Sequence, residues 1–439
     1  MNFDEEVITK NKVNYNYNSA SIIKYLRKVL NVINSEYVDN GMRVAFIMKR
    51  YLEKYKDLID TPIKSESIVL LCLLKDIGCF YQDHEIASDD YATIAASSYA
   101  FLKHCSPLKE NAKPLFYCNA RYIPDVDDIY YNLGMLIALI NKVVLYVYEE
   151  YTLEEIEGFL RKDTSGRVNP KHVKRMLRLL NDEEDILEKL NQKQSLYVHE
   201  VSVFIQNASY TDEELLEFIG TTTFAFEFHN HETLAHTITT AVIARELARL
   251  CRLTPNEINV VYLAGLVHDI GKIMVPIRIL CSPGKLEGDD LKEMRNHVVY
   301  TKQIIEGCFS YKIVEVASNH HERLDGTGYP RGLTGIDLSV WDKILSVADV
   351  TSALYCKRSY KKAFSDEQIV DIVREEAEDG KIDKRVVRHL FDNYEEIMAL
   401  AKEKEELVLE KYDSMRHEFD RIISSNEFKN LFVVNTIEE

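Results

Sequence analysis

The sequence predicts an all-α protein built from two helical bundles and a helical C-terminal extension. Apolar residues recur at helical spacing, as in Ile243, Leu247 and Leu250, and the segment 257–270 follows the same pattern. Stretches with strand-like alternation are scarce, and nine prolines in 439 residues leave room for long uninterrupted helices. A chain of this length exceeds what one core usually serves, so we expect more than one domain.

The composition restricts the classes of partner. A formal net charge of -17 argues against a nucleic-acid polymer or an anionic membrane as the main partner. A small phosphorylated substrate stays compatible with this charge, because bound cations can supply local positive charge. The eight cysteines show no C-x-x-C spacing and are expected to be reduced core thiols.

The N-terminal residues lack the basic start and apolar run of a signal peptide. The most apolar later stretch, Gly134 to Tyr148, is interrupted by Asn141 and Lys142 and is too short to span a bilayer. We therefore expect a cytoplasmic protein without a membrane partner.

The first half of the chain looks like an altered copy of the second. Residues 69–79 align with 262–272, which places Lys75 and Asp76 opposite His268 and Asp269. Further matches join Glu36 to Glu232, Asn40 to His236, Tyr91 to His297, residues 151–156 to 364–369, and 166–169 to 380–383. We interpret these matches as an internal duplication. Chance similarity between two helical bundles is the alternative.

Three segments follow from this alignment. Residues 1–195 are expected to form a degenerate domain without a metal cluster, because its histidines are replaced and Lys75 brings a positive charge. This domain would serve regulation, dimerisation or scaffolding. Residues 196–395 would form the catalytic domain. The charged segment 396–439 carries apolar residues at helical spacing and is expected to be an appended helix that packs against another subunit, as in a homodimer.

The second half contains a concentration of metal-ligand residue types. The two main strings are His268-Asp269-Ile270-Gly271-Lys272 and His320-His321-Glu322-Arg323-Leu324-Asp325-Gly326-Thr327-Gly328-Tyr329-Pro330. The candidate ligands are Glu232, His236, His268, Asp269, His297, His320, His321 and Asp349. Histidines and carboxylates on apolar helices are costly to bury unless they are paired or bound to a metal. The pattern therefore predicts a metal centre.

These strings resemble the HD-GYP family, bacterial phosphodiesterases that hydrolyse cyclic dinucleotides. Both signature blocks are intact and stand in the family's order, and the resemblance covers residues 225 to 395. It implies two or three divalent metal ions. Imidazole and carboxylate ligands without thiolates suit iron or manganese. Asp269 can bridge two ions, and Glu232, four residues before His236, accompanies a third ion in the family. The alternative is that Glu232 only orients a ligating histidine.

The resemblance also assigns residues to the substrate. Lys272 lies one helical turn after His268 and resembles the family lysine that contacts the scissile phosphate. Arg358 and Lys361 match basic positions that hold the substrate's phosphates, and Tyr329 would shape the substrate pocket or a protein interface. Three positions depart from the family pattern, namely Ser282, Ser352 and Ser359. None of them removes a ligand, so they bear on rate and substrate preference.

The sequence thus predicts a metal-dependent phosphodiesterase that opens cyclic di-GMP or 3′,3′-cyclic GMP-AMP to a linear dinucleotide. A metal-activated hydroxide would attack phosphorus, with Asp269 and Lys272 as the catalytic residues. One alternative is a signalling module that binds cyclic dinucleotides with little or no turnover. Another is an HD-type nucleotide phosphohydrolase acting on dNTPs or (p)ppGpp, against which the histidine pair and the Gly-Tyr-Pro loop argue. A protein partner would bind through the first domain or this loop.

Overall fold

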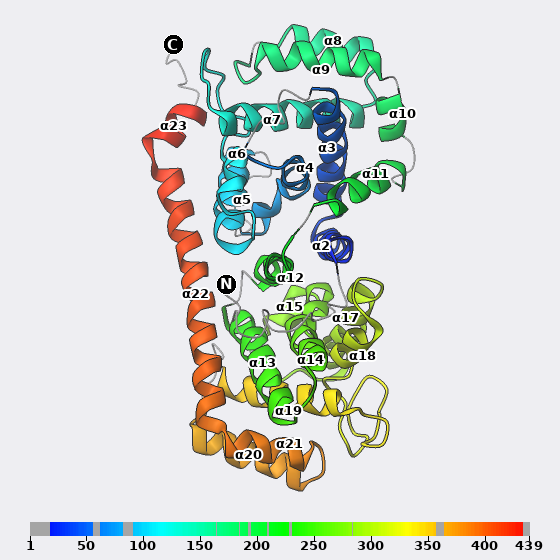
Figure 1. Cartoon of the computed structure of the whole chain (residues 1–439), viewed down its shortest axis with the longest axis vertical. Coiled ribbons are helices and arrows are strands. Elements are labelled where there is room, and N and C mark those ends of the chain that lie inside the picture. The colour runs from blue at the N-terminus through cyan, green and yellow to red at the C-terminus, as the bar shows by residue number, and fades with distance from the viewer. Residues whose placement is uncertain are drawn as a thin grey trace. The chain divides into compact units, whose positions relative to one another are not determined.

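The computed structural model describes residues 18–55, 62–81, 91–163, 165–183, 185–191, 195–208, 210–227, 231–282, 284–356 and 364–432. All regular elements within these ranges are helices, which confirms the all-α prediction (Figure 1). The chain forms two compact units. Unit 1 comprises residues 1–33 and 211–411, and unit 2 comprises residues 34–210 and 412–439.

Unit 1 contains all the predicted metal ligands. Its elements are α2 (Ser19–Ile33), α12 (Asp212–Glu227), α13 (His231–Leu250), α14 (Pro255–Val267), η4 (Ile270–Met274), α15 (Ile277–Leu280), α16 (Gly288–Arg295), α17 (His297–Ile305), α18 (Tyr311–Ser318), α19 (Val340–Tyr355), α20 (Asp366–Glu378) and α21 (Lys384–Asp392). Capping boxes start α14 at Thr254, α19 at Ser339 and α20 at Ser365, so short polar signals define where these helices begin.

Unit 2 is a second helical bundle. Its elements are α3 (Ser35–Lys54), α4 (Ser65–Leu74), η2 (Ile77–Tyr81), α5 (Tyr91–Cys105), η3 (Lys109–Ala112), α6 (Lys113–Phe116), α7 (Ile129–Tyr148), α8 (Leu153–Arg161), α9 (Pro170–Asp182), α10 (Asp185–Asn191), α11 (Ser195–Gln206) and α23 (Asn426–Phe432). By length and composition, α7 could cross a membrane. However, 56% of its apolar window is buried against the protein, as is common in a core helix.

The compact units are divided at other residues than the domain boundaries expected from the sequence, and those boundaries stay a prediction. Helix α2 belongs to unit 1, although it was expected within the first domain, residues 1–195. The chain from Tyr412 onward belongs to unit 2, so the boundary between the units falls within α22 (Tyr394–Ser424). Within unit 1, Tyr25 of α2 lies edge-on to Phe309, and Lys28 donates hydrogen bonds to the backbone oxygens of Gln303 and Glu306. These contacts attach α2 to the end of α17.

Matched segments of the two halves adopt the same local structures. Thr152 caps α8 and Ser365 caps α20, each through a capping box. The glycines that follow, Gly166 and Gly380, both have positive φ. Asn169 and Asp383 then cap α9 and α21 with their side chains. An internal duplication remains a prediction that these correspondences favour.

A close approach between elements places the ligands of unit 1. A Cβ atom on Gly271 would lie 2.0 Å from the backbone oxygen of His297 and 2.3 Å from the nitrogen of Thr301. The Thr301 hydroxyl accepts a hydrogen bond from the Gly271 nitrogen and donates one to the His268 carbonyl. Only glycine lets η4 pack this tightly on α17, and this contact brings the His268-Asp269 pair next to His297.

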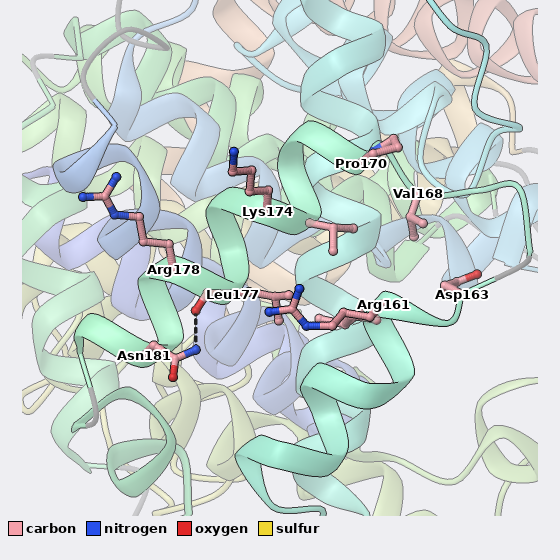
Figure 2. A pocket seen from close by; sticks show the side chains of 10 residues that line it. Arg161, Asp163, Val168, Pro170, Lys174, Leu177, Arg178 and Asn181 are labelled. Atoms are coloured by element: carbon pink, nitrogen blue, oxygen red, sulfur yellow. Dashed lines mark hydrogen bonds between the residues drawn. The ribbon is translucent and has the colours of Figure 1, made fainter.

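A surface hollow of about 550 Å³ lies in unit 2, between α8 and α9. Figure 2 shows side chains that line it, among them the apolar Val168 and Leu177 and the basic Arg161, Lys174 and Arg178. None of the predicted site residues lines this hollow. The candidate site therefore lies outside this hollow, among side chains of unit 1.

Candidate metal centre

Six elements of unit 1 bring seven of the predicted ligands together. His236 lies on α13, and His268 and Asp269 form the junction between α14 and η4. His297 begins α17, His320 and His321 follow α18, and Asp349 lies within α19. These seven residues were predicted from sequence, and the described structure gathers all of them into one cluster.

Three histidines present the same nitrogen to the centre of the cluster. The Nδ1 atoms of His268, His297 and His320 lie 2.6–2.7 Å from the backbone oxygens of Gly265, Met294 and Ala317. A carbonyl oxygen only accepts hydrogen bonds, so each Nδ1 carries a hydrogen and donates it. In the neutral ring the other nitrogen, Nε2, is then a bare lone pair, which is the form that ligates metals.

Two of these lone pairs face one another. The Nε2 atoms of His297 and His320 lie 3.3 Å apart. Burial lowers the pKa of both rings, that of His320 to about 3, so neither carries a second proton near neutral pH. Two facing lone pairs repel unless a cation lies between them. Ligand atoms bound about 2.1 Å from one cation lie roughly 3.0–3.5 Å apart, which matches this separation.

The ligands form two groups joined by Asp269. One group is His236, His268 and Asp269, and the other is His297, His320 and His321. Asp269 Oδ2 lies 3.2 Å from His268 Nε2 and 3.5 Å from His236 Nε2. Its other oxygen, Oδ1, lies 3.4 Å from His297 Nε2. The carboxylate therefore turns one oxygen toward each group, as a bridging ligand does.

Asp349 has the same two-sided placement. Its Oδ1 lies 3.2 Å from His236 Nε2, and its Oδ2 lies 3.5 Å from His321 Nδ1. Asp349 was predicted from the sequence as a ligand, but its second contact was not predicted. Two carboxylates thus lie between the two groups of histidines.

The residues of the cluster fit divalent cations. His268 Nε2 and Asp269 Oδ1 are buried and have no hydrogen-bond partner. Burial raises the pKa of the Asp269 carboxyl, but His268 and Lys272 outweigh it, so this pKa lies well below its ordinary value. Burial lowers the pKa of His236, yet its bonds to Asp269 and Asp349 raise it well above the usual range. A proton on His236 occupies the place that a metal would take.

Lys272 and Tyr329 lie beside the cluster. The Lys272 ammonium contacts Asp269 Oδ2 from one turn further along the chain. The Tyr329 ring lies 4.8 Å from the His321 ring, and the Tyr329 amide donates to the His321 carbonyl. Burial, together with Asp349 and Asp269, raises the pKa of the Tyr329 hydroxyl, so it stays protonated.

The sequence analysis assigned no role to Glu322, which holds the Gly-Tyr-Pro loop in place. Its side chain is only 1% exposed, and its two oxygens accept hydrogen bonds from the backbone nitrogens of Arg331 and Leu333. A Cβ on Gly328 would lie 2.5 Å from the Glu322 Cα, so the loop returns directly over this residue. The available signal in the sequence was an acidic residue directly after the histidine pair.

Ser352 contacts the ring nitrogen of His236 that does not face Asp269 and Asp349. His236 Nδ1 lies 3.0 Å from the Ser352 hydroxyl, which itself donates to the His236 carbonyl oxygen. Thr239 also contacts this hydroxyl, which is fully buried. A serine accepts a weaker hydrogen bond than the aspartate that the family pattern has at this position. His236 is therefore a less basic ligand than it would be beside a carboxylate.

We expect Ser352→Ala to lower the affinity of the protein for metal by about tenfold, because His236 loses the partner that orients its ring. Titration with Mn²⁺, followed by metal analysis, measures the change. Ser346→Ala is a matched control, since Ser346 lies on the same helix and its hydroxyl binds Arg323 instead. Equal metal affinity in the wild type and Ser352→Ala would contradict this role.

Three predicted residues cannot be placed. Arg358 and Lys361 lie outside the described residues. Glu232 lies in the first turn of α13, but its side chain is likewise outside the described part of the structure. Their assigned contacts with phosphate and with a third metal stay predictions.

Comparison with known proteins identifies relatives of this chain. A family model described as HD domain matches residues 175–386. The 3′3′-cGAMP-specific phosphodiesterase 2 of Vibrio cholerae is 28% identical over 393 residues, which cover 81% of this chain and 74% of that protein. A probable cyclic di-GMP phosphodiesterase of the same organism is 38% identical over 145 residues, which cover 30% of this chain and 33% of that protein.

One solved structure supports the fold. It is a crystal structure of a cyclic GMP-AMP specific phosphodiesterase from V. cholerae, with a TM-score of 0.51 and 18% sequence identity. The alignment covers 86% of this chain and 97% of that one. The family model, the relatives and the two intact motifs show that this chain belongs to the HD-GYP group of the HD-domain family.

Proposed function

We propose that this protein is a metal-dependent phosphodiesterase that hydrolyses a cyclic dinucleotide, either cyclic di-GMP or 3′,3′-cyclic GMP-AMP, to the linear dinucleotide. The observation that carries the proposal is the pair of facing Nε2 atoms of His297 and His320, with Asp269 placed between the two ligand groups. The relatives are named for both substrates, so the base composition of the substrate is for experiment to decide.

The cluster would hold two divalent cations, iron or manganese, and a third if Glu232 is a ligand. When bound, such cations neutralise the phosphodiester oxygens and lower the pKa of water so that hydroxide forms near neutral pH. Asp269 and Asp349 would keep the two cations at a fixed separation. Lys272 would direct its ammonium at the phosphate whose charge grows during the reaction.

Unit 2 would have no catalytic role. The groups of side chains that could hold a metal, as far as the structure describes the chain, are both in unit 1. At the position that matches His268 and Asp269, the Lys75 ammonium is buried and contacts the Asp76 carboxylate. We propose that this unit serves regulation or dimerisation in a cytoplasmic protein. Protein partners would bind to it or to the Gly-Tyr-Pro loop.

Turnover by the purified full-length protein tests the proposal. Protein loaded with Fe²⁺ or Mn²⁺ is mixed with each cyclic dinucleotide, and the products are separated by chromatography. Formation of the linear dinucleotide supports the proposal. Binding of a cyclic dinucleotide without product would favour the signalling module, and hydrolysis of dNTPs or (p)ppGpp alone would favour the nucleotide phosphohydrolase.

The two roles considered for Glu232 give different metal counts. We expect Glu232→Gln to lose about one metal per chain and to keep the remaining pair, because the glutamine preserves size but removes the charge that holds a cation. Metal analysis at saturating Mn²⁺ measures this count. An unchanged count, with affinity lowered roughly 10–100-fold, would instead show that Glu232 only orients a ligand.

A further inference from the structure

Arg295 extends the metal centre on the side of the Gly-Tyr-Pro loop. It is the last residue of α16, two positions before the ligand His297, and its side chain is exposed. The guanidinium carbon lies 4.9 Å from the centre of the Tyr329 ring. The same ring also contacts His321, with ring centroids 4.8 Å apart. His321, Tyr329 and Arg295 thus form a continuous series of contacts that begins at the cluster.

The nearby carboxylates already have other partners. All three acidic residues of α16 are engaged: Asp289 with Lys292, Asp290 with Arg278, and Glu293 with Asn296 and Tyr300. Within the described part of the chain, no hydrogen bond or ion pair joins the Arg295 side chain to another residue. Its positive charge is therefore held on an aromatic ring and is not neutralised by an acid.

The other described cations around the cluster and its loop are occupied. Lys272 contacts Asp269, Arg323 donates to the Ser346 hydroxyl, and Arg331 contacts Glu315 and Asn319. Arg295 differs from these three because all its N–H groups remain available. A guanidinium that lies against an aromatic ring keeps its edge free, and this planar edge matches two oxygens of a phosphate.

We propose that Arg295 binds the phosphate of the cyclic dinucleotide that is not cleaved. The proposal rests on the function proposed above. A cyclic dinucleotide has two phosphates, and only one of them can lie between the two ligand groups of the metal centre. The second phosphate needs a cation outside the two ligand groups. Arg295, held against Tyr329, would supply one in addition to Arg358 and Lys361, whose predicted phosphate contacts lie outside the described residues.

The test compares two substrates with Arg295→Gln and Arg295→Lys. One substrate is the cyclic dinucleotide that the wild type hydrolyses, and the other is bis(p-nitrophenyl) phosphate, which has a single phosphodiester. For Arg295→Gln we expect KM for the cyclic dinucleotide to rise about 10- to 100-fold, with kcat nearly unchanged. KM of Arg295→Lys for the cyclic dinucleotide should lie between the values of the wild type and Arg295→Gln, because lysine keeps the charge but loses the planar fork. KM for the single phosphodiester and the metal content should not change.

Arg374→Gln is the matched control. Arg374 lies 5.5 Å over the Phe391 ring, but it pairs with Asp371 at 2.7 Å and lies on α20, which carries none of the ligands. Its KM values should equal those of the wild type.

Several results would overturn the assignment. One is an unchanged KM for the cyclic dinucleotide in Arg295→Gln, and another is an equal rise for both substrates, which would mean that Arg295 acts through the metal centre. A loss that differs between cyclic di-GMP and cyclic GMP-AMP would point to contact with a base. If the wild type hydrolyses bis(p-nitrophenyl) phosphate but no cyclic dinucleotide, the proposed function itself fails.

Discussion

Asp269→Ala is expected to release more than one metal equivalent per chain and to abolish hydrolysis. Each Asp269 oxygen faces a different group of histidines, so its removal opens both metal positions at once. Activity should fall by at least about a thousandfold, because both the charge neutralisation and the formation of hydroxide depend on the paired cations. Metal analysis and turnover on the same sample measure the two effects together.

The chain offers a matched control at the corresponding position of unit 2. Asp76→Ala removes a carboxylate that contacts Lys75. It should leave the metal content and the turnover unchanged, since Asp76 belongs to no candidate group of metal ligands in the described structure. Asp269→Asn separates charge from shape, because it keeps the size of the side chain. Near-normal metal content and rate in Asp269→Ala would show that the bridging assignment is wrong.

Glu322→Ala should have the largest effect on stability among the residues around the loop. The alanine leaves the Arg331 and Leu333 amides without their acceptor, in a segment that packs over the same residue. We expect the free energy of unfolding to fall by about 3 kcal/mol, since each hydrogen bond to a buried charge is worth about 1.5–3 kcal/mol and the two share one carboxylate. Denaturation by urea measures this loss.

Glu322→Gln provides the comparison for this prediction. The amide oxygen can still accept one of the two hydrogen bonds, so we expect an intermediate loss. Glu293→Gln should lower the free energy of unfolding by less than about 1 kcal/mol, because that site is partly exposed. The Glu293 oxygens bind the Asn296 and Tyr300 side chains. Glu322→Ala with wild-type stability would contradict the role given to this carboxylate.

The sequence predicted the composition of the site better than its geometry. Eight candidate ligands could be named because histidines and carboxylates on apolar helices are costly to bury unless they are paired or bound to a metal. Seven of them lie together in the described structure. The convergence of His268 and His297 depends on the close packing at Gly271, which spacing alone does not reveal. The double contact of Asp349 depends on the orientation of α19 and was not predicted.

Long-range contacts account for the remaining differences. Arg295 appears in the sequence as an ordinary basic residue at the end of a short helix. Its stacking on Tyr329 arises only because the loop after His321 returns to α16. Similarly, the amphipathic residues of α2 show that the helix buries one face, but not that this face contacts Phe309 nearly three hundred residues later. Local patterns carry no information on such partners.

Metal content and cyclic-dinucleotide hydrolysis, measured on the same preparation of the full-length protein before and after chelation, test the central claim most directly. We predict two or three equivalents of iron or manganese per chain, loss of hydrolysis when the metal is removed, and recovery when Mn²⁺ is restored. Hydrolysis that persists in metal-free protein would contradict the claim. So would a fully loaded protein that binds neither cyclic di-GMP nor cyclic GMP-AMP and hydrolyses neither.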